Sequence, residues 1–72
     1  MVDKVQRIIA DVCHVAHSEV RVERELSAYG MDSARAMDLV IAIEDTFNVD
    51  IPDELMYQFR TANDIVKALE TL

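Results

Sequence analysis

Residues 30–47 read GMDSARAMDLVIAIEDTF and predict one well-delimited helix. Gly30 interrupts the chain just before the helix. Asp32 is a good N-cap, because its carboxylate can accept a hydrogen bond from the amide two or three residues further on. Ser33 then occupies the first helical position, and the apolar periodicity continues to about Phe47. The stretch therefore predicts a helix over 33–47 whose first residue carries a hydroxyl that is not needed as a cap.

This helix has two different faces. The face expected to point into the core is formed by Ala36, Leu39, Val40, Ile43 and Phe47. On the other side, Met37 and Ile41 stand one turn apart among acidic residues. Either they pack against a neighbouring loop or the next helix, or they form an exposed apolar pair, which is typical of a surface that binds other proteins. We predict a docking surface that comprises Asp32, Arg35, Met37, Asp38, Ile41, Glu44 and Asp45.

The flanking sequence predicts three further helices. An apolar repeat favours a helix from about Val2 to Ala16, and a long polar stretch follows from His17 to Asp32. A short helix is expected to start around residues 51–54 (IPDE), where proline and acidic residues suit a first turn. Thr61, with Asp64 three residues later, marks the start of another helix. The predicted fold is all-α, a small four-helix bundle with three longer helices and one short third helix, as a single domain over residues 1–72.

Charge narrows the classes of partner. The chain of 72 residues has a net charge of −7, and no Lys or Arg occurs between Ala36 and Phe59. Nucleic-acid binding is not expected, because it requires basic residues that neutralise the phosphates. We expect protein partners with basic surfaces instead. No apolar run is long enough for a membrane span, and the N-terminal residues lack the apolar segment of a secretory signal. We expect a monomeric, cytoplasmic protein.

The remaining reactive side chains do not form an evident catalytic site. Cys13 is the only cysteine and is expected to be buried and inert within the first helix. His14 and His17 are expected on the surface, and nothing in the sequence places either beside Ser33, so a serine nucleophile with a histidine base is not supported. The acidic segment 45–54 lacks the glycine and the ligand spacing of a calcium-binding EF-hand loop.

Three segments together resemble a known family. Gly30-Met31-Asp32-Ser33-Ala34 is similar to the Gly-x-Asp-Ser-Leu motif of acyl and peptidyl carrier proteins. The stretch 39–47 (LVIAIEDTF) is similar to the second helix of that family, and IPDE at 51–54 is a further family signature at matching separation. Each motif alone is weak, but three in register within a chain of carrier length are specific.

The resemblance implies a function. A phosphopantetheinyl transferase would attach a 4′-phosphopantetheine arm to Ser33, and the arm would hold acyl cargo as a thioester. Acyl-loading and acyl-modifying enzymes with basic surfaces would dock on the second helix, so the chain itself is expected to be a carrier and not a catalyst. Whether cargo enters the bundle is left open, although Ile43, Phe47 and Leu69 could line a cavity there.

Three positions depart from the family pattern. Ala34 replaces the usual leucine after the serine, Tyr29 replaces a common leucine before the glycine, and Arg35 adds a positive charge to the docking helix. These departures favour a specialised polyketide, peptide or fatty-acid-type pathway over housekeeping fatty-acid synthesis. The alternative is a carrier-like interaction adaptor that is never modified.

Overall fold

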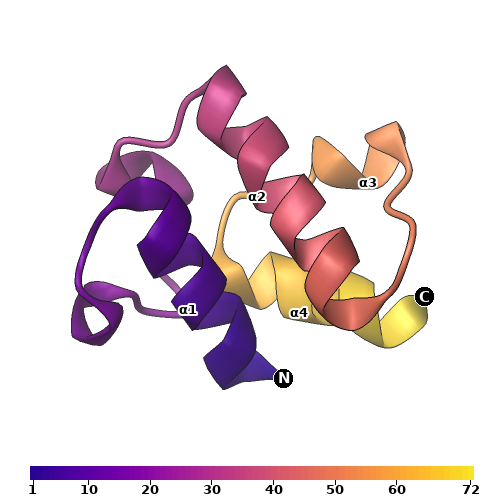
Figure 1. Cartoon of the computed structure of the whole chain (residues 1–72), viewed down its shortest axis with the longest axis horizontal. Helices are drawn as coiled ribbons and strands as arrows, with labels where there is room; N and C mark the ends of the chain where they lie inside the picture. The colour runs from indigo at the N-terminus through magenta and orange to yellow at the C-terminus, as the bar shows by residue number, and fades with distance from the viewer.

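The computed structural model describes all residues from 1 to 72 and contains helices but no β-strand. Helix α1 lies against both α2 and α4, while the short α3 stands at the edge of the bundle beside α2 (Figure 1). The predicted four-helix bundle with a short third helix is confirmed. The elements in chain order are α1 (Val2–Cys13), the 3-10 helices η1 (His17–Glu19) and η2 (Leu26–Tyr29), α2 (Ser33–Phe47), α3 (Asp53–Met56) and α4 (Ala62–Thr71).

The core is built from one apolar stripe on each of the three longer helices. Five side chains are essentially inaccessible, namely Val5 and Ile9 of α1, Leu39 and Ile43 of α2, and Ile65 of α4. Burying a side chain of this size stabilises the fold by about 1.5–3 kcal/mol. No polar or charged residue is buried. The core face predicted for residues 33–47 is confirmed at Leu39, Val40 and Ile43, and Ala36 and Phe47 lie at its half-buried margin.

Helix α1 ends earlier than the sequence predicted. The expected end was about Ala16, but the helix stops at Cys13 because His14 adopts a left-handed conformation with φ 57°. The Val15 amide then donates to the carbonyl of Ala10 at 3.1 Å, which closes the helix end. The apolar periodicity continued past this point because Val15 still packs against the core from outside the helix.

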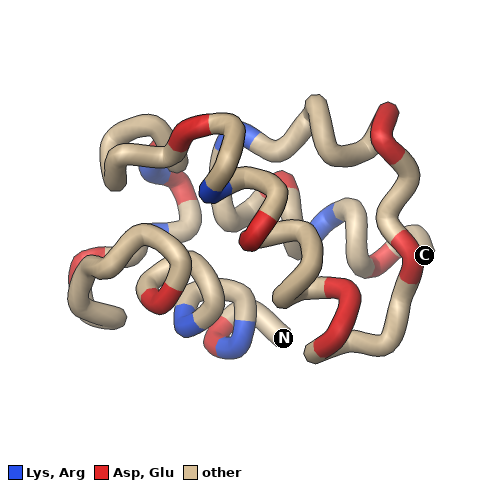
Figure 2. The backbone as a smooth tube through the Cα atoms, turned by 45° about the horizontal axis from the view of Figure 1, so that its top comes forward, with Lys and Arg blue, Asp and Glu red and all other residues tan.

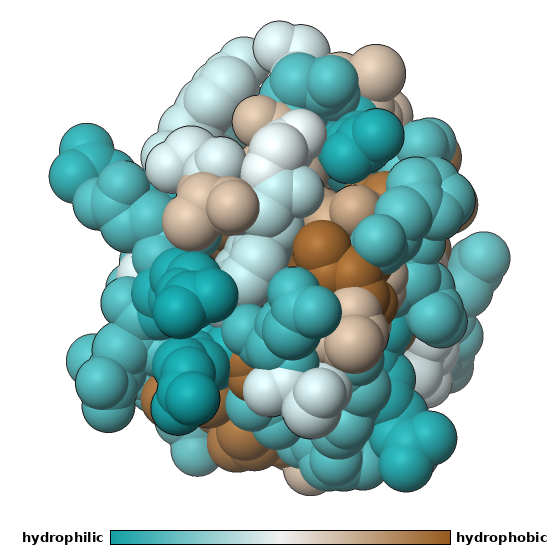
Figure 3. Space-filling model, turned by 90° about the vertical axis from the view of Figure 1, so that its left-hand side faces the viewer, coloured by the Kyte–Doolittle hydropathy of each residue, from teal (hydrophilic) through white to brown (hydrophobic).

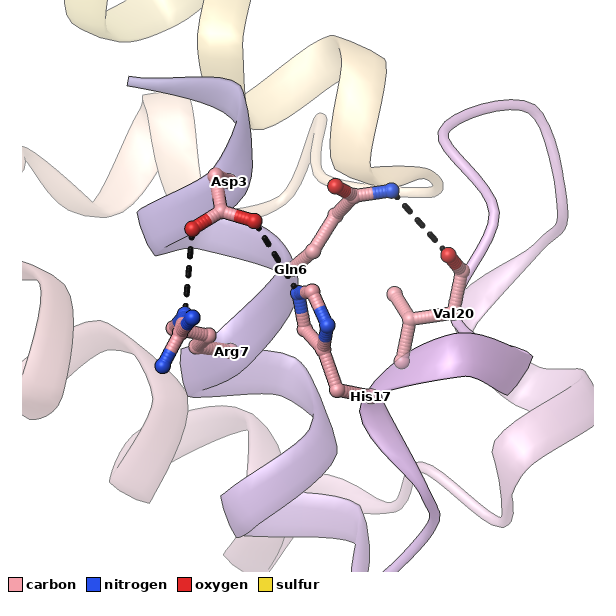
Figure 4. A network of polar contacts seen from close by, with 5 residues as sticks. All are labelled: Asp3, Gln6, Arg7, His17 and Val20. Carbon is pink, nitrogen blue, oxygen red and sulfur yellow. Dashed lines mark hydrogen bonds and ion pairs between the residues drawn. The ribbon is translucent and has the colours of Figure 1, made fainter.

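The long connection between α1 and α2 is tied down at several points. Two contacts hold it to α1: the Gln6 side-chain amide donates to the Val20 carbonyl at 3.0 Å, and His17 lies 3.3 Å from Asp3, which also pairs with Arg7 (Figure 4). Val20 and Leu26 of this connection are both buried in the core.

Two further contacts hold the connection to the start of α4. The Leu26 amide donates to the Arg60 carbonyl at 2.7 Å, beside an isolated bridge between Glu25 and Thr61. Thr61 and Asp64 form the predicted capping box of α4, each accepting from the other's backbone amide. These contacts fix the connection on both sides and so determine where α2 begins.

Candidate functional site

The start of α2 is organised by its cap. Gly30 has φ 81°, a left-handed conformation that glycine adopts without strain, and Asp32 is extended. The Asp32 carboxylate accepts from the Arg35 amide at 2.8 Å, so the predicted N-cap is confirmed. The helix begins at Ser33 and ends at Phe47, as the sequence predicted, and Asn48 follows it in a left-handed conformation.

Ser33 is left with an exposed and unengaged hydroxyl. Its side chain takes part in none of the side-chain hydrogen bonds of the protein, since Asp32 already caps the helix. The backbone amides of Ser33 and Ala34 have no backbone acceptor. Free amides at a helix start favour a negative group, so this end of α2 suits a phosphate ester on the hydroxyl.

An open groove of about 460 Å³ adjoins Ser33, between the start of α2 and α3. Apolar side chains dominate it, and methionine contributes three of them, which gives an adaptable wall. The groove is lined by Met31, Asp32, Ser33, Ala36, Met37, Met56 and Tyr57. No cavity is lined by Ile43, Phe47 or Leu69, the three residues that could have enclosed cargo inside the bundle.

The outer face of α2 leaves two apolar side chains in solvent. Met37 and Ile41 are each 51% exposed, so neither the long connection nor α3 covers them. Asp38 and Asp45 on the same helix are also exposed. By contrast, the side of the molecule formed by α1 and the long connection is mostly hydrophilic, with small separate apolar spots (Figure 3). The other large apolar side chains that are exposed are Met1, Val2 and Leu72 near the chain ends and Tyr57 after α3.

Two members of the predicted docking surface have intramolecular roles that the sequence did not reveal. The half-buried Glu44 accepts from the Ile51 amide at 2.8 Å, in the connection to α3. Arg35 is also half-buried. One nitrogen of its guanidinium group lies 3.5 Å from the position that a Cβ atom on residue 30 would occupy. No local sequence motif predicts either contact, because Ile51 and Gly30 belong to connections whose path depends on the tertiary fold.

Charge is unevenly distributed around the site. The segment from Ala36 to Phe59, which spans most of α2, the connection after it and α3, carries acidic residues and no Lys or Arg, whereas both kinds of charge occur over the rest of the chain (Figure 2). No group of three or more His, Cys, Asp or Glu side chains is arranged to hold a metal ion, and no helix is long and apolar enough to cross a membrane.

The other candidate reactive residues, Cys13, His14 and His17, form no hydrogen bond with Ser33. Cys13 is 4% exposed at the end of α1, and burial raises the pKa of its thiol, an effect that nearby Arg35 opposes and Asp32 reinforces. The prediction that Cys13 is buried is confirmed. His14 and His17 are exposed, also as predicted, and His17 contacts Asp3.

The structure is thus a small four-helix bundle with an exposed serine hydroxyl at the capped start of α2. Comparison with known proteins identifies the family. The model of the phosphopantetheine attachment site matches residues 3–69, and the chain belongs to this family. It is a non-catalytic carrier of acyl groups, and its cofactor is 4′-phosphopantetheine.

Relatives cover nearly the whole chain. It is 33% identical to an acyl carrier protein of Wolinella succinogenes, over 96% of this chain and 92% of that protein. It is also 31% identical to a non-reducing polyketide synthase of Emericella nidulans, over 99% of this chain but 3% of the synthase. The fold matches a free-standing peptidyl carrier protein of a secondary metabolic pathway in Acinetobacter baumannii, with a TM-score of 0.83 at 18% identity, covering 97% of this chain and 88% of that one.

Proposed function

We propose that Ser33 is the attachment point. A phosphopantetheinyl transferase would break the pyrophosphate bond of coenzyme A, join the phosphate of the arm to the Ser33 oxygen, accept the hydroxyl proton and release adenosine 3′,5′-bisphosphate. The observation that carries this proposal is the free hydroxyl at the start of α2, which Asp32 relieves of the capping role. The unpaired amides of Ser33 and Ala34 would stabilise the new phosphodiester. The chain itself supplies no base for the transfer, so the transferase would provide one.

We further propose that partner enzymes dock on the outer face of α2. Met37 and Ile41 would supply apolar contact, while Asp38 and Asp45 would meet basic residues of the partner. Asp32 and Arg35 lie at the Ser33 end of this face, where the arm leaves the protein. Glu44 belongs to the same helix, but its carboxylate is engaged by the connection to α3.

The pathway we propose is a specialised one, of the polyketide, peptide or fatty-acid type. Ala34 and Tyr29 depart from the usual carrier pattern, and the matched segment of the Emericella nidulans synthase belongs to a polyketide enzyme. The three methionines of the groove beside Ser33 would contact the first part of the arm or its cargo without demanding one shape. The intact mass of the protein from its source, with cargo attached, would test this assignment.

Substitution of Ser33 by alanine tests the attachment directly. The protein is incubated with coenzyme A and a broad-specificity phosphopantetheinyl transferase, and its intact mass is measured. The unchanged chain is expected to gain one phosphopantetheine, and Ser33→Ala none. Ser27→Ala, which removes an exposed hydroxyl in η2, is the matched control and should still gain one. If no transferase modifies the unchanged chain, an adaptor role replaces the carrier role.

A further inference from the structure

We infer that Glu44 is a positioning residue that holds α3 beside Ser33 through the reach of its side chain, and not a charge offered to partner enzymes. This inference rests on the proposed function, because it concerns the groove at the attachment site. It also separates Glu44 from the exposed carboxylates of the same helix, with which the sequence pattern had grouped it.

Glu44 accepts hydrogen bonds from three of the four amides in residues 48–51. Its backbone carbonyl accepts from Asn48 and, at 3.2 Å, from Val49, and its carboxylate accepts from Ile51 at 2.8 Å. The first two bonds close the end of α2, and the third fixes the residue where the chain turns towards α3. The backbone of Glu44 thus closes the helix, and its side chain alone holds the connection beyond it, at Ile51.

The position of α3 depends on that connection. The helix spans only Asp53–Met56, and none of its residues is fully buried. Ile51 just before it is 8% exposed and belongs to the core, so the Ile51 amide is a fixed point next to a weakly packed element. Met56 and Tyr57 follow within six residues and form the far wall of the groove beside Ser33. A shift of the Ile51 anchor would therefore move this wall.

Reach and charge can be separated by two conservative variants. Glu44→Gln removes the charge but keeps an acceptor oxygen at the same distance, whereas Glu44→Asp keeps the charge on a side chain one methylene shorter. If Glu44 acts by reach, the Ile51 amide in Glu44→Asp should exchange with solvent about tenfold faster than in the unchanged chain, while Glu44→Gln stays within about threefold. Asp45→Asn, at the next and exposed position, should leave Ile51 exchange unchanged.

The rate of arm transfer supplies the second readout. Glu44→Gln should be modified faster than Glu44→Asp, with amide signals of Met56 and Tyr57 shifted only in the latter. The inference is overturned if Glu44→Asp protects Ile51 as well as the unchanged chain does, or if Glu44→Gln is the slower substrate. Failure of every variant to accept the arm would remove the proposed function instead, and the exchange rates at Ile51 would still decide the role of Glu44.

Discussion

At the start of α2, Asp32 caps the helix and the adjacent Ser33 keeps its hydroxyl free. A serine at a helix start is commonly the cap, with its oxygen bound to a backbone amide. Here Asp32 takes that bond at 2.8 Å, and Ser33 keeps a free hydroxyl beside free amides. The carboxylate also leaves a negative charge near the proposed attachment point, and this charge would attract basic surfaces.

Cys13 illustrates a single residue whose chemistry is suppressed by its surroundings. It is 4% exposed, and burial is the main cause of its raised thiol pKa. Because the native pKa exceeds the unfolded one, the folded state retains the thiol proton more strongly. This contribution to stability is complete below the pKa of the unfolded thiol and is lost as the pH rises through the raised native pKa.

We therefore predict a pH-dependent difference between the unchanged chain and Cys13→Ala. Urea unfolding is measured for both at intervals from pH 7 to pH 10. Above about pH 8.5, near the pKa of an unfolded thiol, the free energy of unfolding of the unchanged chain should fall more steeply with pH than that of Cys13→Ala. Parallel curves for the two proteins over this range would contradict the inferred pKa shift.

Helix α2 serves two purposes through its two faces. Ile43 is fully buried in the core, while Ile41, two positions earlier, is 51% exposed on the outer face. An α-helix turns about 200° over two residues, so these identical side chains point in opposite directions. One contributes to folding, and the other is available for contact with a partner.

These two isoleucines make a matched pair of tests. Ile43→Ala should lower the free energy of unfolding by about 2–5 kcal/mol, since it leaves a cavity in the core. Ile41→Ala should change it by less than about 0.5 kcal/mol but should slow arm transfer, because it removes apolar contact with the transferase. Urea unfolding and initial transfer rates check both. An unaltered transfer rate in Ile41→Ala would remove this residue from the docking surface.

The whole molecule carries a net charge of −7, and the segment from Ala36 to Phe59 contains six acidic residues and no Lys or Arg. Such an arrangement attracts basic surfaces more strongly at low salt, because exposed charges are screened beyond about 8–10 Å at physiological ionic strength. The position of the acidic residues on α2 and the total charge of the protein could each account for such attraction. Only an effect of position would show that α2 itself faces the partner.

A comparison of two double variants separates position from total charge. Asp38→Asn with Asp45→Asn removes two charges from α2, and Asp11→Asn with Glu23→Gln removes two exposed charges elsewhere. The first pair should slow arm transfer roughly two- to tenfold at low salt, and the difference should shrink as salt is raised. The second pair should have little effect. Equal slowing in both would show that net charge alone matters.

The sequence by itself determined the features that depend on residues within one helical turn of each other. The cap at Asp32, the span of α2 from Ser33 to Phe47 and the capping box of α4 all follow from short-range contacts, and all were predicted correctly. The buried face of α2 followed as well, because helical periodicity alone assigns residues to faces. Together these features specified the bundle and the exposed serine.

Only the tertiary structure decided the contacts between segments that are distant along the chain. In the tertiary structure, α1 ends before His14, and the Glu44 carboxylate accepts a hydrogen bond from the Ile51 amide. An open groove also lies between Met37 and Met56. Each depends on the path of a loop, and that path is determined by packing against several elements at once. Because no local pattern encodes such a path, the sequence grouped Glu44 with the exposed acids, whereas the fold gave it a different partner.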